Sequence, residues 1–125
     1  MMNAAMNEEM KACYEACIAC AQACNECFDA CLKEDDVDML RDCIRLDREC
    51  ADLCAFAAQS MAASSSYFAE LCMICAEVCQ HCGEVCARHE HEHCKRCAEA
   101  CFKCAEACMS MVKRMSMQQR THAEA

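Results

Sequence analysis

Cysteine recurs along this chain at alternating steps of three and four residues, and this spacing constrains the fold more than any other feature of the sequence. The average step of about 3.5 residues is the period of the a and d positions of a heptad, so each run of cysteines forms one stripe along one side of a helix. The four runs are Cys13, Cys17, Cys20, Cys24, Cys27 and Cys31; Cys43, Cys50 and Cys54; Cys72, Cys75, Cys79, Cys82 and Cys86; and Cys94, Cys97, Cys101, Cys104 and Cys108. The sequence therefore predicts four helices, and the single skipped position in the second run carries Asp47.

The residues between the cysteines favour the same four helices, because alanine is abundant and proline, the strongest helix breaker, is absent. We expect the helices at about residues 8–32, 36–62, 66–88 and 91–116. Short connections make consecutive helices antiparallel neighbours, so we predict an all-α, up-down-up-down four-helix bundle. It forms a single domain over residues 1–125, with a frayed tail at residues 118–125. The cysteine stripes of such a bundle converge on its axis and line the core with thiols.

Composition argues against several classes of protein. Leu, Ile, Val and Phe total only 16 of 125 residues and the net charge is −9, values that ordinarily indicate disorder, but here cysteine occupies the core positions. An odd number of cysteines, with one glycine and no proline, argues against a disulfide framework. The N-terminal residues do not have the pattern of a signal peptide, and no run of apolar residues is long enough for a membrane span. We expect a cytosolic protein with reduced thiols that binds neither membranes nor nucleic acid, which its acidic surface would repel.

A core of 19 thiols indicates metal binding, because oxidisable cysteines are a liability that packing alone would not repeat at every core position. The sequence has no C-x-x-C-H haem motif, no iron–sulfur run ending in proline, and no strand for a thioredoxin-like C-x-x-C. Thiolates select soft ions, and two thiolates can hold Cu(I). Roughly one Cu(I) per cysteine would leave the core neutral, which avoids the cost of burying unpaired charge. Many equivalent sites suit storage or sequestration better than catalysis, so we do not expect an enzyme.

Two other functions stay open on the residues alone. A thiol-based redox protein or peroxide sink would use a few cysteines of low pKa that react first. A zinc or cadmium thiolate buffer would use the same ligands, although chains of the metallothionein type lack helical periodicity.

Three segments carry a resemblance to a known family: CYEACIACAQACNECFDAC, LCMICAEVCQHCGEVC and HEHCKRCAEACFKCAEAC. Through them the chain resembles the cysteine-rich four-helix-bundle copper storage proteins, from about Cys13 to Met115, and without an export signal it is similar to their cytosolic branch. The resemblance implies that the inward cysteines of all four helices carry many Cu(I) ions. It also implies association of bundles into homo-oligomers, tetramers in particular. Copper donor and acceptor proteins are the expected partners of such a store.

The two ends of the predicted bundle differ in chemistry. One end collects Glu34, Asp36, His89, Glu90, His91 and His93. We predict that His89, His91, His93 and Asp47 form a polar mouth where copper enters and leaves. We count all four, together with the cysteines, as candidate metal ligands. Asp47 is included because a carboxylate that faces thiols needs a cation or a hydrogen-bond donor.

Methionines and one phenylalanine extend the cysteine stripes at the opposite end of the bundle. They are Met6, Met10, Met61, Phe68, Met111 and Met115. We expect them to plug the core, with Cu(I) ligation by the thioethers as the alternative. Gly83, beside Cys82, is expected to let two helices approach closely.

Overall fold

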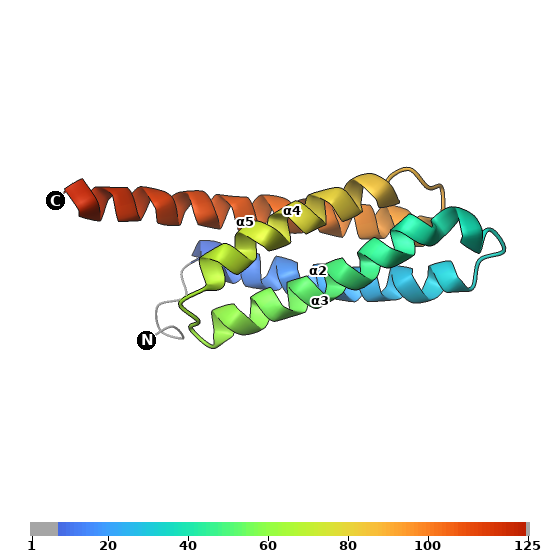
Figure 1. Cartoon of the computed structure of the whole chain (residues 1–125), viewed down its shortest axis with the longest axis horizontal. Helices are drawn as coiled ribbons and strands as arrows, with labels where there is room; N and C mark the ends of the chain where they lie inside the picture. Colours follow the sequence, from blue (N-terminus) through green and yellow to red (C-terminus); the bar gives the residue numbers. More distant parts are fainter. Residues whose placement is uncertain (1–7, 125) are drawn as a thin grey trace.

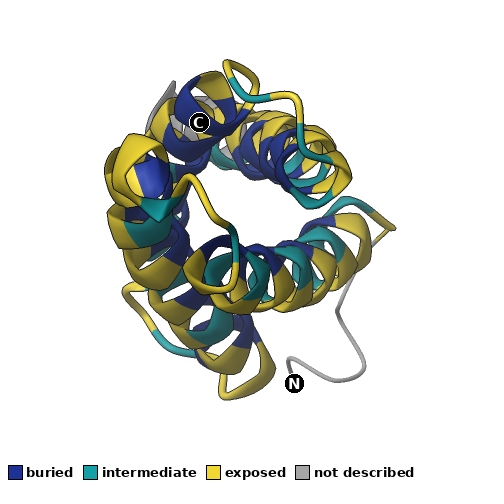
Figure 2. Cartoon of the chain, turned by 90° about the vertical axis from the view of Figure 1, so that its right-hand side faces the viewer, coloured by how far each residue is buried: buried dark blue, intermediate teal, exposed yellow. Residues whose placement is uncertain are grey.

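The computed structural model describes residues 8–124, without the side chains of residues 116–124. Its elements are α2 (Glu8–Leu32), η1 (Val37–Leu40), α3 (Arg41–Ala62), α4 (Phe68–Cys86) and α5 (Glu92–Glu124). The four long helices run alternately up and down, as the sequence predicted, and no strand occurs in the described part of the chain (Figure 1). Each helix packs against the next one in sequence, and α5 closes the ring against α2 (Figure 2).

Helix ends differ from the predicted ones by a few residues, most of all in α5. The second helix begins as a turn of 3₁₀ helix, η1, before the α-helical segment from Arg41. Helix α4 ends at Cys86 and not near residue 88. Helix α5 continues to Glu124, so the tail from residue 118, which we expected to be frayed, is helical. Neither glycine nor proline follows Cys108, and nothing in the local sequence breaks the helix there.

The core of the bundle consists largely of sulfur. All 19 cysteines are buried, each with at most 1% of its surface exposed. Small alanines and a few larger side chains, such as Leu40 and Met61, complete the core around them. A free thiol packs as a small apolar group, so the thiols take the place of leucine in the core. None of the helices among residues 8–124 has the length and apolar character that a membrane span requires.

The ring of Phe102 on α5 packs directly against Gly83 on α4. A Cβ atom at Gly83 would lie only 2.7 Å from Cε1 of the Phe102 ring. The ring of Phe102 therefore occupies the space that a side chain at position 83 would need, and glycine at this position makes room for it.

Candidate metal centre

One layer of the core receives a thiol from each of the four helices. Its members are Cys20 on α2, Cys50 on α3, Cys79 on α4 and Cys101 on α5. The Sγ atom of Cys20 lies 3.8 Å from Cys50, 3.9 Å from Cys79 and 3.7 Å from Cys101. The Sγ atom of Cys50 lies 3.6 Å from Cys79 and 4.0 Å from Cys101. The predicted convergence of the four stripes on the bundle axis is therefore seen directly in this layer.

Similar contacts continue in both directions along the axis. Several groups of four sulfurs have all their Sγ atoms within 4.8 Å of one another, close enough to share a metal ion. These groups include Cys17, Cys75, Cys104 and Cys108; Cys20, Cys24, Cys50 and Cys101; Cys20, Cys50, Cys54 and Cys79; and Cys24, Cys82, Cys97 and Cys101. Since one cysteine belongs to more than one group, the thiols form a continuous array of overlapping sites.

The closest sulfur contacts lie towards the two ends of the array. The Sγ atoms of Cys43 and Cys86 are 3.1 Å apart, and those of Cys13 and Cys108 are 3.3 Å apart. The spacing along each helix gives no sign of these two contacts, because each pair joins different helices. Cys72 packs in the same buried core at the Cys13 end.

Asp47 fills the skipped cysteine position and is fully buried. Its Oδ1 accepts hydrogen bonds from the thiols of Cys82, Cys86 and Cys97, at 3.4, 3.5 and 3.2 Å. Its Oδ2 lies 3.7 Å from Cys43. Burial raises the pKa of the Asp47 carboxyl, and the negative charge of nearby thiolates raises it further. The carboxyl group thus joins the thiol array, as its position in the sequence suggested.

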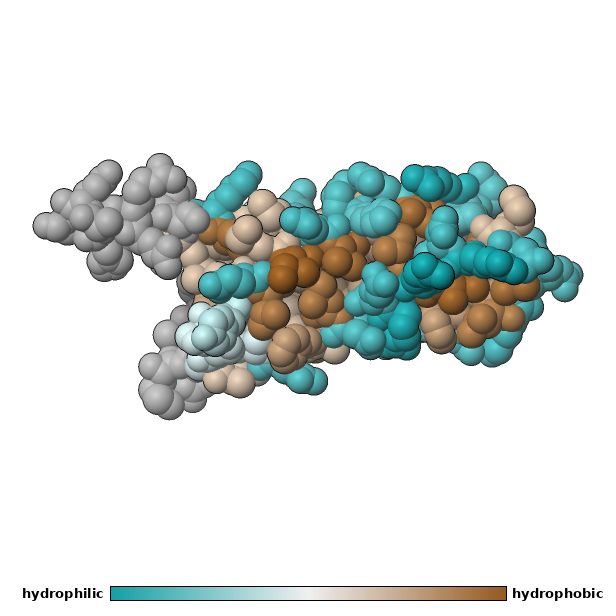
Figure 3. Space-filling model, viewed as in Figure 1, coloured by the Kyte–Doolittle hydropathy of each residue, from teal (hydrophilic) through white to brown (hydrophobic). Residues whose placement is uncertain are grey.

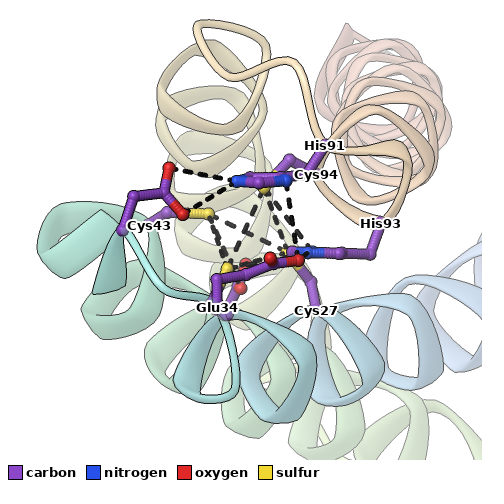
Figure 4. Close-up of polar contacts among 9 residues, drawn as sticks. Cys27, Glu34, Cys43, His91, His93 and Cys94 are labelled. Carbon is purple, nitrogen blue, oxygen red and sulfur yellow. Dashed lines mark hydrogen bonds and ion pairs between the residues drawn. The ribbon is translucent and has the colours of Figure 1, made fainter. Parts of the chain in front are cut away.

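The polar end of the bundle brings one histidine directly to the thiols. Nδ1 of His93 lies 3.5 Å from Cys27, 3.9 Å from Cys31 and 3.6 Å from Cys94 (Figure 4). On the other side of the ring, Nε2 of His93 lies 2.9 Å from Oε2 of Glu34. Burial is the largest influence on the pKa of His93 and lowers it, but Cys27 and Glu34 together outweigh it and raise the pKa. Only 12% of the His93 side chain is exposed, so it lies at the boundary between solvent and core.

His91 lies over His93 but contacts carboxylates and not thiols. The two rings are stacked, with centroids 5.2 Å apart and planes inclined by 6°. Nε2 of His91 lies 3.1 Å from Asp36, and its Nδ1 lies 3.5 Å from Glu34. The hydrogen bond from His91 lowers the pKa of Asp36. His91 therefore holds the acidic turn after α2 against the turn before α5.

His89 does not continue the cysteine stripe, because α4 ends at Cys86 and His89 lies in the following turn. Its backbone N–H donates to the carbonyl of Cys86 at 3.1 Å. Among the described residues, the His89 side chain makes no hydrogen bond or ion pair. The structure thus brings His93 to the thiols and His91 into contact with the acidic turn, whereas His89 acts on that turn only through its charge, which helps to lower the pKa of Asp36.

Thiol acidity differs sharply within this end of the core. Hydrogen bonds from Cys43 and Cys86 lower the pKa of Cys27 to about 5, and the hydrogen bond with His93 acts in the same direction. Burial raises the pKa of Cys31 and of Cys94, and the charges of neighbouring thiolates raise both further. Among the three cysteines that contact His93, Cys27 is therefore the one whose pKa is lowered.

The methionines lie at the opposite end. Met61 and Met111 are buried, and Met10 and Phe68 pack against the core in half-buried positions. Met6 lies outside the described residues. The guanidinium of Arg114 forms an ion pair with Glu9 at 2.8 Å, which joins the start of α2 to α5 at this end. The positions of Met61 and Met111 agree with a plug of apolar side chains.

Comparisons with known proteins bear on the same region of the chain. The family model described as copper storage protein matches residues 6–113. The Cu(I)-bound copper storage protein BsCsp3 is 51% identical over 84% of this chain and 99% of its own, with a TM-score of 0.81. The metal-free copper storage protein 3 from Bacillus subtilis is 52% identical over 82% of this chain and 97% of its own, with a TM-score of 0.76.

A cytosolic copper storage protein from Streptomyces lividans, in a structure with five coppers, is 45% identical over 85% of this chain and 93% of its own, with a TM-score of 0.81. None of the curated proteins matches the chain. The matched residues contain all 19 cysteines.

Proposed function

Because this chain belongs to the copper storage protein family, we propose that it stores many Cu(I) ions on the thiolates that line its bundle. The observation that carries the proposal is the central layer, in which four helices each supply one thiol and five of the six sulfur–sulfur separations are 3.6 to 4.0 Å. Thiolates are the ligands that soft Cu(I) prefers. An array of overlapping sulfur sites offers many similar positions for such ions and no unique position for a substrate, which favours storage over catalysis.

Pairs of cysteines one helical turn apart supply the simplest sites for single ions. The Sγ atoms are 3.9 Å apart in Cys20 and Cys24, 3.7 Å in Cys27 and Cys31, and 3.9 Å in Cys50 and Cys54. The corresponding separations are 3.8 Å in Cys75 and Cys79, and 3.9 Å in both Cys82 with Cys86 and Cys97 with Cys101. A Cu(I) ion held between two such sulfurs needs only a small change of rotamer.

Charge sets the expected capacity at roughly one Cu(I) per cysteine. Each thiol that binds loses a proton, so the negative charge of the thiolates would be buried if too few ions entered. At one ion per thiolate the core is neutral. All 19 cysteines are therefore proposed ligands, with His91, His93 and Asp47 as polar groups at the end where copper enters and His89 in the adjoining turn.

The setting of the store is proposed to be the cytosol, as for the relative from Streptomyces lividans, with copper donor and acceptor proteins as its partners. Association into homo-oligomers is supported by apolar side chains on the outer surface. Phe56 of α3 and Met73 and Ile74 of α4 are among the exposed large apolar residues, and Figure 3 shows apolar surface running along the face that α3 and α4 present. A bundle with such a face is expected to bury it against further copies, up to the proposed tetramer.

Anaerobic titration of the reduced protein with Cu(I) tests the proposal, in the presence of a competing chelator and with native mass spectrometry as the readout. Uptake that approaches one ion per cysteine supports storage. Saturation after one or two ions would instead indicate a sensor or a chaperone, and turnover of a disulfide or peroxide substrate would indicate a redox protein. The same spectra report the number of chains in the assembly.

A further inference from the structure

Four ligand atoms at the polar end of the bundle stand at the corners of a nearly regular tetrahedron. They are the Sγ atoms of Cys27, Cys31 and Cys94 and the Nδ1 atom of His93 (Figure 4). The three sulfur–sulfur distances are 3.7, 3.9 and 3.9 Å. The three nitrogen–sulfur distances are 3.5, 3.9 and 3.6 Å.

These six distances match the edges of a tetrahedral Cys₃His zinc site. Zinc lies about 2.3 Å from a thiolate sulfur and about 2.0–2.1 Å from an imidazole nitrogen, so the edges of a regular site are about 3.8 Å between sulfurs and about 3.6 Å between nitrogen and sulfur. Every measured edge agrees with these values to within about 0.3 Å. A Cu(I) ion bound by two thiolates would use only two of the four donors, whereas a tetrahedral ion uses them all.

The far side of the His93 ring is arranged as in metal sites. Glu34 accepts a hydrogen bond from Nε2–H of His93 at 2.9 Å, which leaves the lone pair of Nδ1 directed towards the three sulfurs. Glu34 is itself held by Nδ1 of His91, at 3.5 Å. A carboxylate that fixes the tautomer and orientation of a ligating imidazole is the usual outer partner of a histidine bound to zinc.

Charge also separates this cluster from the all-cysteine groups. Three thiolates and a neutral imidazole carry −3, so a divalent ion leaves a net charge of −1, whereas a single Cu(I) leaves −2. A divalent ion among four thiolates also leaves −2, and there the charge would lie in the fully buried part of the core. Cys43 borders the cluster, 3.9 Å from Cys27, but it lies closer to Cys86, at 3.1 Å.

We propose that Cys27, Cys31, His93 and Cys94 also form a binding site for one divalent ion of the zinc class, which takes the place of the Cu(I) ions that the same thiols bind when the store is loaded. Binding replaces the protons of the three thiols, which pass to solvent, and His93 binds as the neutral imidazole. The proposal goes beyond copper storage, because it concerns a different ion and a ligand set that includes an imidazole nitrogen beside three sulfurs.

The test uses the reduced, metal-free, full-length protein under anaerobic conditions. Co(II), which reports tetrahedral thiolate coordination through its visible absorption, is added to one equivalent and then displaced with Zn(II). The affinity for Zn(II) is measured against a competing chelator for the wild type, His93→Ala, Glu34→Ala and the control His81→Ala, a substitution of an exposed residue on α4.

We expect the first equivalent of Co(II) to give a tetrahedral spectrum of the Cys₃His type in the wild type and in His81→Ala. Loss of the outer carboxylate in Glu34→Ala should weaken Zn(II) binding about 10- to 100-fold, and loss of the ligand in His93→Ala should weaken it at least as much. Equal affinity in His93→Ala and the wild type would place the ion in the all-cysteine core and overturn the proposal, as would a spectrum without tetrahedral character.

Two further measurements keep the outcome interpretable. Circular dichroism of each variant checks that the bundle is folded, and Glu34→Ala supplies a second test that leaves all four ligands in place. Titration of the same samples with Cu(I) separates the two proposals. Full copper capacity without a high-affinity zinc site would overturn only the zinc inference, whereas a zinc site without copper capacity would overturn only the storage function.

Discussion

The Sγ atom of Cys97 lies 3.2 Å from Oδ1 of Asp47, a contact that places a carboxyl group inside the thiol-lined core. Two more thiols, from Cys82 and Cys86 on α4, donate to the same oxygen. The protonated carboxyl is the form that this buried site favours, because burial and the charge of nearby thiolates raise the pKa of Asp47. Ionisation of Asp47 should therefore oppose folding of the metal-free protein.

Replacement of Asp47 by asparagine should stabilise the metal-free protein at neutral and alkaline pH. The pKa of Asp47 is raised in the folded state, so the stability linked to this group is fully present below its unfolded value near 3.8 and is lost as pH rises towards the folded value. The two proteins should melt alike at pH 4, whereas at pH 8 Asp47→Asn should be more stable by at least about 1 kcal/mol. Thermal melts of the reduced proteins, followed by circular dichroism from pH 4 to 8, measure the difference. If the stability of both proteins depended on pH in the same way, the raised pKa of Asp47 in the folded state would be contradicted.

Substitution of two thiols in the central layer should lower copper capacity without unfolding the bundle. Cys20 and Cys101 each contact several other sulfurs, and serine is close to cysteine in size but is a poor ligand for Cu(I). Cys20→Ser/Cys101→Ser should bind about two fewer Cu(I) ions than the wild type, at about one ion per thiolate. Native mass spectrometry of the loaded proteins gives the count. Met39→Leu, at a residue that is 73% exposed, serves as the control and should keep full capacity.

The sequence was sufficient to predict the fold and the burial of the thiols, because the period of a cysteine stripe is a local property of the helix that carries it. Asp47 could also be predicted to face the core, since it occupies a stripe position. The roles of the three histidines could not be separated, because they lie around the turn between α4 and α5, and the cysteine stripes do not tell at which residue each of these helices ends. Whether His93 or His89 reaches the thiols depends on the residue at which α4 ends and on contacts with Glu34, which comes from a different turn.

The close packing of α4 on α5 should make Gly83→Ala destabilising, although alanine is the better helix former by about 1 kcal/mol. The added methyl group would meet the ring of Phe102 at 2.7 Å, and overpacking of this kind costs about 1–3 kcal/mol. In a Phe102→Ala background the clash is absent, so the same substitution should stabilise the protein. Urea unfolding of the four proteins in this double-mutant cycle measures both effects. A stabilising effect of Gly83→Ala in the presence of Phe102 would show that the ring moves aside without cost.

Removal of the histidines at the polar end should slow copper loading without lowering the final capacity. The His93 ring lies between solvent and Cys27, the thiol at this end with the pKa lowered to about 5, so it covers the ligand most ready to receive the first ion. The triple variant with alanine at positions 89, 91 and 93 should therefore load several-fold more slowly from a Cu(I) chelator, as measured by stopped-flow absorbance. The single variant His93→Ala should account for most of the effect and His89→Ala for little, because only His93 contacts thiols. His81→Ala is the matched control on the outer surface of α4, and unchanged loading kinetics in the triple variant would exclude a role for this end in copper uptake.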